Sequence, residues 1–120
     1  RLRVARKLSE ALRPLERHLQ LPYVPPDREH MFMLYPLVAR SGDKRKLVEF
    51  LEEGGVETRD LLPLINQPVY MKMFGNLESR YPVAKHLNKA AFYIGCHQHI
   101  SDKDIDFVAD RFKKFFKVRG

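Results

Sequence analysis

Residues 92–116 read FYIGCHQHISDKDIDFVADRFKKFF, and this stretch combines a short apolar strand with an amphipathic helix. Phe92–Gly95 is the predicted strand. Ser101 with Asp104 three residues later has the spacing of a capping box, which predicts that a helix starts there. The apolar residues of this helix recur at helical intervals and share one side: Ile105, Val108, Phe112 and Phe115 or Phe116. The stretch therefore predicts a sheet covered by helices.

The first forty residues predict a helix, a linker and a second strand. An apolar stripe places a helix from about Leu2 to Arg13, after which Pro14 produces a kink or opens a second short helix that ends near Gln20. A cluster of prolines then indicates an extended linker. The apolar run Met31–Ala39 that follows is long enough for a buried strand.

A helix and a strand are predicted between residues 43 and 62. The helix has one apolar side opposite a charged side, and Gly54 with Gly55 is typical of a left-handed helix end. Its apolar side consists of Leu47, Val48 and Leu51. Val56–Leu62 then predicts a strand, which Pro63 closes.

Residues 63–81 have no regular apolar period, which predicts a long loop of the kind that more often has a function than not. Pro82–Ala91 predicts a short helix, because proline suits a first turn. The elements thus alternate as helix, strand, helix, strand, loop, helix, strand and helix. This order predicts one α+β domain over residues 1–120, a two-layer sandwich with a small, mostly antiparallel sheet of about three strands.

The composition indicates a folded protein from a reducing compartment. The chain has 120 residues, of which 44% are apolar, so it can build a core of its own. Its single cysteine, Cys96, cannot form an internal disulfide, and no apolar run approaches the ~18 residues of a membrane helix. We therefore expect a cytoplasmic protein. Because the chain begins with Arg1 and not with Met, we also expect a fragment or a processed product.

The formal charge of +7 is concentrated toward the two ends of the chain. In the last helix the aspartates come early and the basic residues late, which puts each sign where the helix dipole favours it. We therefore interpret the basic end as helix electrostatics and not as a nucleic-acid surface, since no stacking aromatics alternate with it on a strand.

The run Cys96-His97-Gln98-His99 is the densest cluster of possible metal ligands. A structural zinc site needs four ligands, usually as two pairs, and the chain has no second such pair, so no metal site is predicted. Cys96 is interpreted as a small buried side chain. The paired carboxylates on predicted helix surfaces are interpreted as solvated charges: Glu52 with Glu53, and Asp102 with Asp104.

The segment from Gly55 to Tyr70 has the clearest set of ligand-binding side chains. Arg59, Asn66, Gln67 and Tyr70 provide a cation, two amides and a phenol without a catalytic base. This set suits the holding of a polar, phosphorylated ligand. The ordinary alternative is that Arg59 pairs with a nearby acid, while the two amides bond the loop backbone.

Several segments occur in an order that resembles a known family. They are the strand near Met31–Val38, the helix ending in Gly54-Gly55, VETR at 56–59, NQPVY at 66–70, PVAKHL at 82–87 and ISDKDI at 100–105. Together they resemble the C-terminal part of the DegT/DnrJ/EryC1/StrS family. Its members are pyridoxal-phosphate-dependent aminotransferases, with some dehydratases, that act on nucleotide-linked keto-sugars.

The resemblance implies an aspartate-aminotransferase-type fold, in which a large N-terminal domain holds the cofactor and its lysine. This chain matches the small C-terminal domain, so we expect it to bind no cofactor, to hold no catalytic residue and to be inactive alone. The parent enzyme is expected to use pyridoxal phosphate, a nucleotide-sugar substrate and an amino donor, and to be a homodimer. Neither nucleic acid nor membrane is an expected partner.

The resemblance also implies substrate-binding roles for Arg59, Asn66, Gln67, Tyr70 and His97. Many members have a histidine where this chain has Ile65-Asn66, so transamination and dehydration both stay open. Two other classes also stay open. One is a free-standing basic module that binds nucleic acid or another anion, and the other is a structural dimerisation domain.

Overall fold

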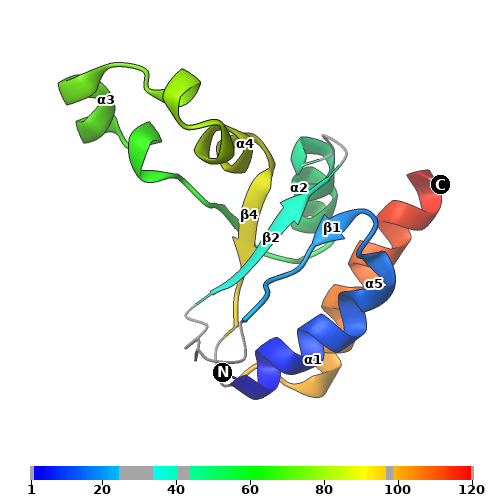
Figure 1. The fold of residues 1–120 in the computed structure, drawn as a ribbon. Coiled ribbons are helices and arrows are strands. Elements are labelled where there is room, and N and C mark those ends of the chain that lie inside the picture. The colour runs from blue at the N-terminus through cyan, green and yellow to red at the C-terminus, as the bar shows by residue number, and fades with distance from the viewer. Residues whose placement is uncertain (1, 25–33, 41–43, 97–98, 120) are drawn as a thin grey trace.

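One antiparallel sheet with the strand order β1-β2-β4-β3 lies at the centre of the computed structural model, which describes residues 2–24, 34–40, 44–96 and 99–119 (Figure 1). β4 lies between β2 and β3, where Tyr93 is opposite Pro36 on one side and Arg59 on the other. The strands are β1 (Leu19–Gln20), β2 (Tyr35–Ala39), β3 (Thr58–Asp60) and β4 (Ala91–Ile94).

Helices cover this sheet and confirm the predicted α+β sandwich. α1 and α5 lie side by side, and α2 packs against α5 and β3. The described helices are α1 (Leu2–Leu12), α2 (Lys44–Glu53), α3 (Pro68–Phe74), α4 (Pro82–Ala90) and α5 (Asp102–Arg119), with 3-10 turns η1 (Arg13–Leu15), η2 (Leu64–Asn66) and η3 (Glu78–Arg80). None of these helices is long and apolar enough to span a membrane.

The core lies between the central strands and the layer of α1, α2 and α5. β2 alternates between buried and half-buried residues, as expected for a strand with one face on the core. The rings of Phe92 on β4 and Phe112 on α5 stack with centroids 6.4 Å apart, and both are fully buried. Leu8 and Leu12 of α1 join the same cluster. The apolar stripes of α1 and α5 thus meet on one face of the sheet.

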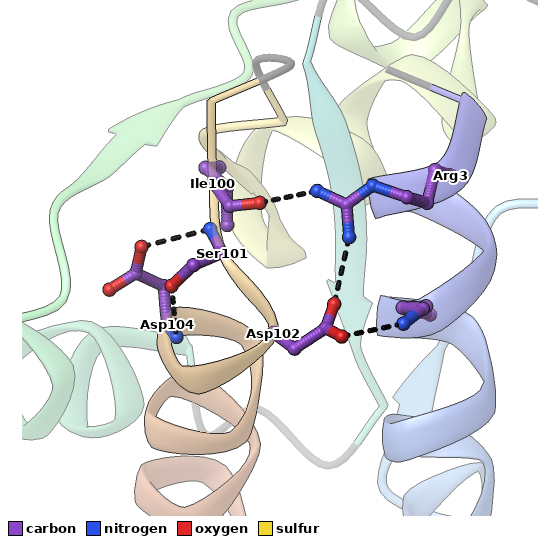
Figure 2. A network of polar contacts seen from close by, with 6 residues as sticks. Arg3, Ile100, Ser101, Asp102 and Asp104 are labelled. Atoms are coloured by element: carbon purple, nitrogen blue, oxygen red, sulfur yellow. Dashed lines mark hydrogen bonds and ion pairs between the residues drawn. The ribbon is translucent and has the colours of Figure 1, made fainter.

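The start of α5 is fixed by the predicted capping box. The backbone N–H of Ser101 donates to Asp104 Oδ2 at 3.0 Å, and the backbone N–H of Asp104 donates to Ser101 Oγ at 3.2 Å (Figure 2). The sequence indicated that Asp102 is a solvated charge, but the structure gives it two basic partners. It accepts from Arg3 at 2.8 Å and from Lys7 at 2.9 Å, while Arg3 also donates to the carbonyl of Ile100 at 2.7 Å. This cluster ties α1 to the first turn of α5.

The end of α2 has the predicted left-handed geometry. Gly55 has a φ of +95°, a backbone conformation in which a residue with a side chain would be strained. The backbone N–H of Val56 donates to the carbonyl of Leu51 at 2.8 Å. The bond turns the chain sharply from α2 toward β3.

Three predictions about elements need correction. The sheet has four strands, because Leu19–Gln20, for which the sequence left open a continued kinked helix or a short second helix, pairs with β2 instead. Only the 3-10 turn Arg13–Leu15 remains of that helix. Residues 63–81, expected to be a loop, contain α3, since Pro68 presets the first helical turn there. The predicted strand over Val56–Leu62 is shorter at both ends, and residues 31–33 of the other long strand lie outside the described residues.

The chain between β3 and α4 extends away from the rest of the domain. Figure 1 shows α3 at the far end of this extension, distant from α1 and α5. We name residues 61–83 the arm. From Arg59 to Lys89 no residue is buried, although all of these residues are described. The arm therefore contributes no side chain to the core.

We expect Phe112→Ala to lower the free energy of unfolding by about 3–5 kcal/mol, because it leaves a cavity beside Phe92 in a fully buried position. Chemical denaturation measures the loss. Phe107→Ala, on the same helix but with 42% of the residue exposed, is the matched control and should cost clearly less. Equal losses for the two variants would contradict the described core.

Stability should also depend on pH through Asp102. The hydrogen bond from Lys7, together with the charges of Lys7 and Arg3, holds the pKa of Asp102 below its ordinary value. The folded chain therefore binds this proton less readily than the unfolded chain, so the stabilisation is present above the unfolded pKa of about 4 and is lost as pH falls through the folded pKa.

The measurement is the urea midpoint at pH 7 and at pH 3 for the wild type, Asp102→Asn and Asp106→Asn. Asp102→Asn should lower the midpoint at pH 7 and reduce the drop between the two pH values. Asp106 lies on the same helix with no ion pair to another described residue, so Asp106→Asn should keep the wild-type drop. An unchanged drop in Asp102→Asn would refute the role of this carboxylate.

Candidate functional site

Arg59 lies on β3, the strand at one edge of the sheet. Its side chain is 66% exposed, and Nη2 donates to Glu57 Oε1 at 2.7 Å. The ordinary alternative for this residue, pairing with a nearby acid, is thus confirmed. Because both side chains are largely exposed, the pair is weak and the guanidinium can exchange Glu57 for another anion.

The strand that holds Arg59 is anchored to α2 by Glu52. One oxygen of Glu52, Oε1, accepts from both the backbone N–H and the hydroxyl of Thr58 at 2.8 Å. The hydrogen bond from the Thr58 backbone N–H has the largest effect in lowering the pKa of Glu52. The bond from the Thr58 hydroxyl and the positive charge of Arg59 lower this pKa further. The sequence interpretation of Glu52 as a solvated charge is therefore wrong. Its two hydrogen bonds to Thr58 fix the start of β3.

Asn66 ends η2 and connects the two 3-10 turns of the arm. Its Nδ2 donates to Glu78 Oε2 at 3.3 Å, and Asn76 Oδ1 in turn accepts from the backbone N–H of Glu78 at 3.0 Å. Asn66 Oδ1 is buried and has no hydrogen-bond partner among the described residues. Asn66 thus bonds a side chain and not the loop backbone, and its carbonyl oxygen is left to accept from a donor.

Gln67 and Tyr70 lie at the start of α3. Gln67 precedes Pro68 with extended backbone, and its carbonyl accepts from Met71 N–H at 3.0 Å. Its exposed side chain makes no capping bond. The ring of Tyr70 lies 5.9 Å from that of Phe74, and the residue is half-buried. Neither side chain is needed to bond the backbone of the arm.

Three of the five predicted substrate-binding residues lie close together along the chain. Asn66 ends η2, Gln67 precedes α3 and Tyr70 lies in α3, whereas Arg59 lies on β3, the strand that leads into the arm. In the part of the chain that the structure describes, no hydrogen bond or ring contact joins the side chains of Asn66, Gln67 and Tyr70. No hydrogen bond or ion pair within the described ranges joins Arg59 to the arm. His97 lies outside the described residues.

Sequence reasoning missed two acidic partners and the apolar character of the arm. Glu57 could have been found from its position two residues before Arg59, since such residues share a face of a strand. Glu78 had no comparable signal, because its contact with Asn66 spans 12 residues through irregular backbone. The exposed apolar residues of the arm were present in the sequence but lack a helical period.

Cys96 is buried as predicted, with 1% of the residue exposed. No cluster of three or more His, Cys, Asp or Glu side chains with metal-binding geometry occurs among residues 2–24, 34–40, 44–96 and 99–119. The basic end of α5 also has local partners. Lys114 pairs with Asp110 at 3.2 Å, and the Arg111 guanidinium lies 4.9 Å from the centroid of the Phe107 ring. Both contacts lie within α5, and the interpretation of this end as helix electrostatics stays a prediction.

The sheet, its helical layer and the arm together have a fold that also occurs in solved aminotransferases. A DegT DnrJ EryC1 StrS aminotransferase from Brucella abortus superposes with a TM-score of 0.74 at 23% identity, over 94% of this chain and 29% of that one. Bacillus subtilis NtdA with bound cofactor PMP superposes with a TM-score of 0.79 at 19% identity, over 98% of this chain and 28% of NtdA.

The model of the DegT/DnrJ/EryC1/StrS aminotransferase family matches residues 1–113, and the chain belongs to this family. A curated relative is the lipopolysaccharide biosynthesis protein RfbH of Salmonella typhimurium, which is 25% identical over 114 residues. That match covers 91% of this chain and 26% of RfbH. The chain thus spans less than a third of the length of these relatives.

Enzymes of this family use pyridoxal phosphate, a cofactor that needs a lysine amine facing a pocket. Only Lys7 and Lys44 of the described lysines are partly buried, and each is paired with an aspartate, Asp102 at 2.9 Å and Asp60 at 3.2 Å. These residues do not form a pyridoxal site, and no catalytic step is assigned to them.

We expect Arg59→Ala to change the free energy of unfolding by no more than about 0.5 kcal/mol, because its ion pair is exposed. Thr58→Val, one residue earlier, removes the hydroxyl that donates to Glu52 and should lower the melting temperature measurably. Calorimetry on the two variants tests this contrast. A large loss in Arg59→Ala would mean that Arg59 is structural.

Proposed function

We propose that this chain, residues 1–120, is the C-terminal small domain of a pyridoxal-phosphate-dependent aminotransferase that acts on nucleotide-linked keto-sugars. The family match supports this proposal, as does the coverage of 26% of RfbH, because an enzyme of that length has room for a separate cofactor-binding domain. RfbH is named for lipopolysaccharide biosynthesis. We therefore assign the proposed enzyme to the synthesis of lipopolysaccharide, other surface polysaccharide or amino sugars.

The proposal rests on the position of Asn66, Gln67 and Tyr70 along one part of the arm. Arg59 lies on β3, the strand that directly precedes the arm. Two amides, a phenol and a guanidinium offer hydrogen bonds and a positive charge, but no proton acceptor near neutral pH. Such a set holds a polar ligand and leaves the chemistry to other groups. In this proposal Arg59 exchanges Glu57 for a diphosphate, whose oxygens match the fork of a guanidinium. His97 is added to the proposed set by resemblance alone, and it is the one member that could accept a proton near neutral pH.

The cofactor and the catalytic lysine belong, in this proposal, to the larger domain of the enzyme. The isolated chain is then inactive, since its partly buried lysines are engaged by aspartates. The complete enzyme would be a cytoplasmic homodimer that takes a nucleotide sugar and an amino donor, with neither nucleic acid nor membrane as partner. The domain would contribute to the sugar-nucleotide cleft and to the subunit interface.

Dehydration of the same class of substrate is the second candidate, and Asn66 is the observation that favours it. By resemblance, many members of the family have a histidine near this position, and members with asparagine include sugar 3-dehydratases alongside some aminotransferases. The Asn66 amide cannot accept a proton and is bonded to Glu78. Analysis of the product separates the candidates, because transamination replaces the keto oxygen with an amino group, whereas dehydration removes the elements of water and adds no nitrogen.

The test of the proposed site is Arg59→Ala in the enzyme that contains this domain. Loss of a hydrogen-bonded cation facing a diphosphate should raise the KM for the nucleotide sugar about 10- to 100-fold, because such bonds contribute about 1.5–3 kcal/mol. Steady-state kinetics with the nucleotide sugar as varied substrate measures the change.

Arg45→Ala is the matched control. Arg45 pairs with Glu49 on the outer surface of α2 and its side chain is 92% exposed, so KM should stay at the wild-type value. Unchanged KM and turnover in Arg59→Ala would remove Arg59 from the site.

A further inference from the structure

A cavity of about 350 Å³ lies beside β1, at the opposite edge of the sheet from β3 and Arg59. We name this cavity the β1 pocket. Residues 21–24, which follow β1, give it an apolar wall. Its polar lining comes from α1, the turn after α1, β1 and the end of β2: Ser9, Arg13, Glu16, Gln20 and Arg40. A cavity of this volume suits a small molecule, and none of the residues of the arm, all of which are described, lines it.

The helix side of the β1 pocket follows from the spacing of three residues. Ser9, Arg13 and Glu16 are separated by four and three positions, so they share one side of α1 and of the turn that continues it. Ser9 Oγ lies 2.7 Å from the hydroxyl of the buried Tyr35. Burial raises the pKa of Tyr35 to about 12, against the opposing effects of the Ser9 bond and the Arg13 charge, and the charge of Glu16 adds to the rise. Both charged side chains therefore lie near this pair of hydroxyls.

Arg40 forms the other side of the β1 pocket. Its Nε donates to the carbonyl of Glu16 at 2.7 Å, and its backbone N–H donates to the carbonyl of His18 at 2.9 Å. These bonds hold Arg40 beside the turn after α1, but its Nη1 and Nη2 groups bond no other described residue. The side chain of Arg13 likewise forms no hydrogen bond or ion pair within residues 2–24, 34–40, 44–96 and 99–119. The pocket therefore contains two guanidinium groups that are free to bind a ligand.

The charges of the β1 pocket indicate one small anion. Arg13 and Arg40 contribute two positive charges and Glu16 one negative charge, and the Glu16 carboxylate forms no ion pair with another described residue. Guanidinium groups match the paired oxygens of a carboxylate or a phosphate. Nucleic acid would need basic residues along several phosphates, whereas a concave site with a single excess positive charge suits one anionic group.

We infer that the β1 pocket binds a small metabolite that joins one anionic group, a carboxylate or a phosphate monoester, to an apolar or aromatic body. Arg13 and Arg40 hold the oxygens of the anionic group. Ser9 and Gln20 offer further hydrogen bonds. The body of the ligand lies against the apolar wall, where Tyr23 is 78% exposed and has a ring face available for contact. This site does not depend on the proposed function, because it lies at the other edge of the sheet from β3 and the arm.

Amide chemical shifts of the isotope-labelled 120-residue chain test the inference, in titrations with phenyl phosphate and with benzoate. The two probes share a ring and differ in the anionic group, and benzamide is the neutral control. We expect one probe or both to bind, with shift changes confined to the lining of the β1 pocket. The tighter of the two probes identifies the anionic group, and benzamide should bind clearly more weakly than benzoate.

Three variants make the titration specific. Arg13→Ala should weaken binding of the tighter probe about 10-fold or more, because charge-assisted hydrogen bonds are lost, yet leave the melting temperature unchanged. Glu16→Gln should tighten the binding of phenyl phosphate, because it removes the negative charge of the pocket and keeps the backbone carbonyl that Arg40 bonds. Arg6→Ala is the matched control and should bind as the wild type does. Arg6 is also exposed on α1 and unpaired among the described residues, but it does not line the pocket.

Four results would overturn the inference. Equal weakening in Arg13→Ala and Arg6→Ala would mean that the probes respond to the overall positive charge of the chain. Benzamide that binds as tightly as benzoate would exclude an anion site. Shift changes outside the pocket, or none with either probe, would exclude this cavity as the site. Finally, Asp27 and Glu29 follow the pocket residues in the sequence. If Asp27→Asn with Glu29→Gln raised the affinity about 10-fold or more, these carboxylates and not a metabolite would be the occupants.

Discussion

The burial of the apolar side of α5 against the sheet is the contact on which the other elements depend. Phe112 stacks on Phe92 of the central strand β4, and both α1 and α2 pack against α5 in turn. Without α5, the apolar faces of those two helices would have no common layer to join. The capping box at Ser101 and Asp104 fixes the residue at which α5 begins.

Elements whose apolar faces are covered within the chain could be predicted from the sequence. α1, α2 and α5 show a helical period because their stripes all face one core. β1 could not be predicted, since two residues are too few to show alternation and its pairing depends on the distant Ala39. α3 was missed for a different reason. Its apolar residues, Val69 and Met73 among them, face solvent in this chain. Packing against the core therefore does not impose a helical spacing on the apolar residues of α3.

The kinds of side chain in the candidate site could be read from the sequence, but their relations could not. The pairing of Arg59 with Glu57 follows from the alternation of a strand once β3 is known. The contact between Asn66 and Glu78 does not, because it depends on the path of two 3-10 turns around α3. Tyr70 was expected among ligand-binding residues, and its ring also packs against Phe74, so it belongs to the arm as well as to the site.

The ion pair between Arg3 and Asp102 joins residues separated by 99 positions. On a ribosome, the second partner emerges only when most of this sequence has been made. Until then Leu8 and Leu12, which are buried in the finished domain, have no helix to cover them. The domain therefore cannot complete its core until α5 has been made, and a nascent chain stalled before α5 presents an apolar helix to chaperones or to aggregation.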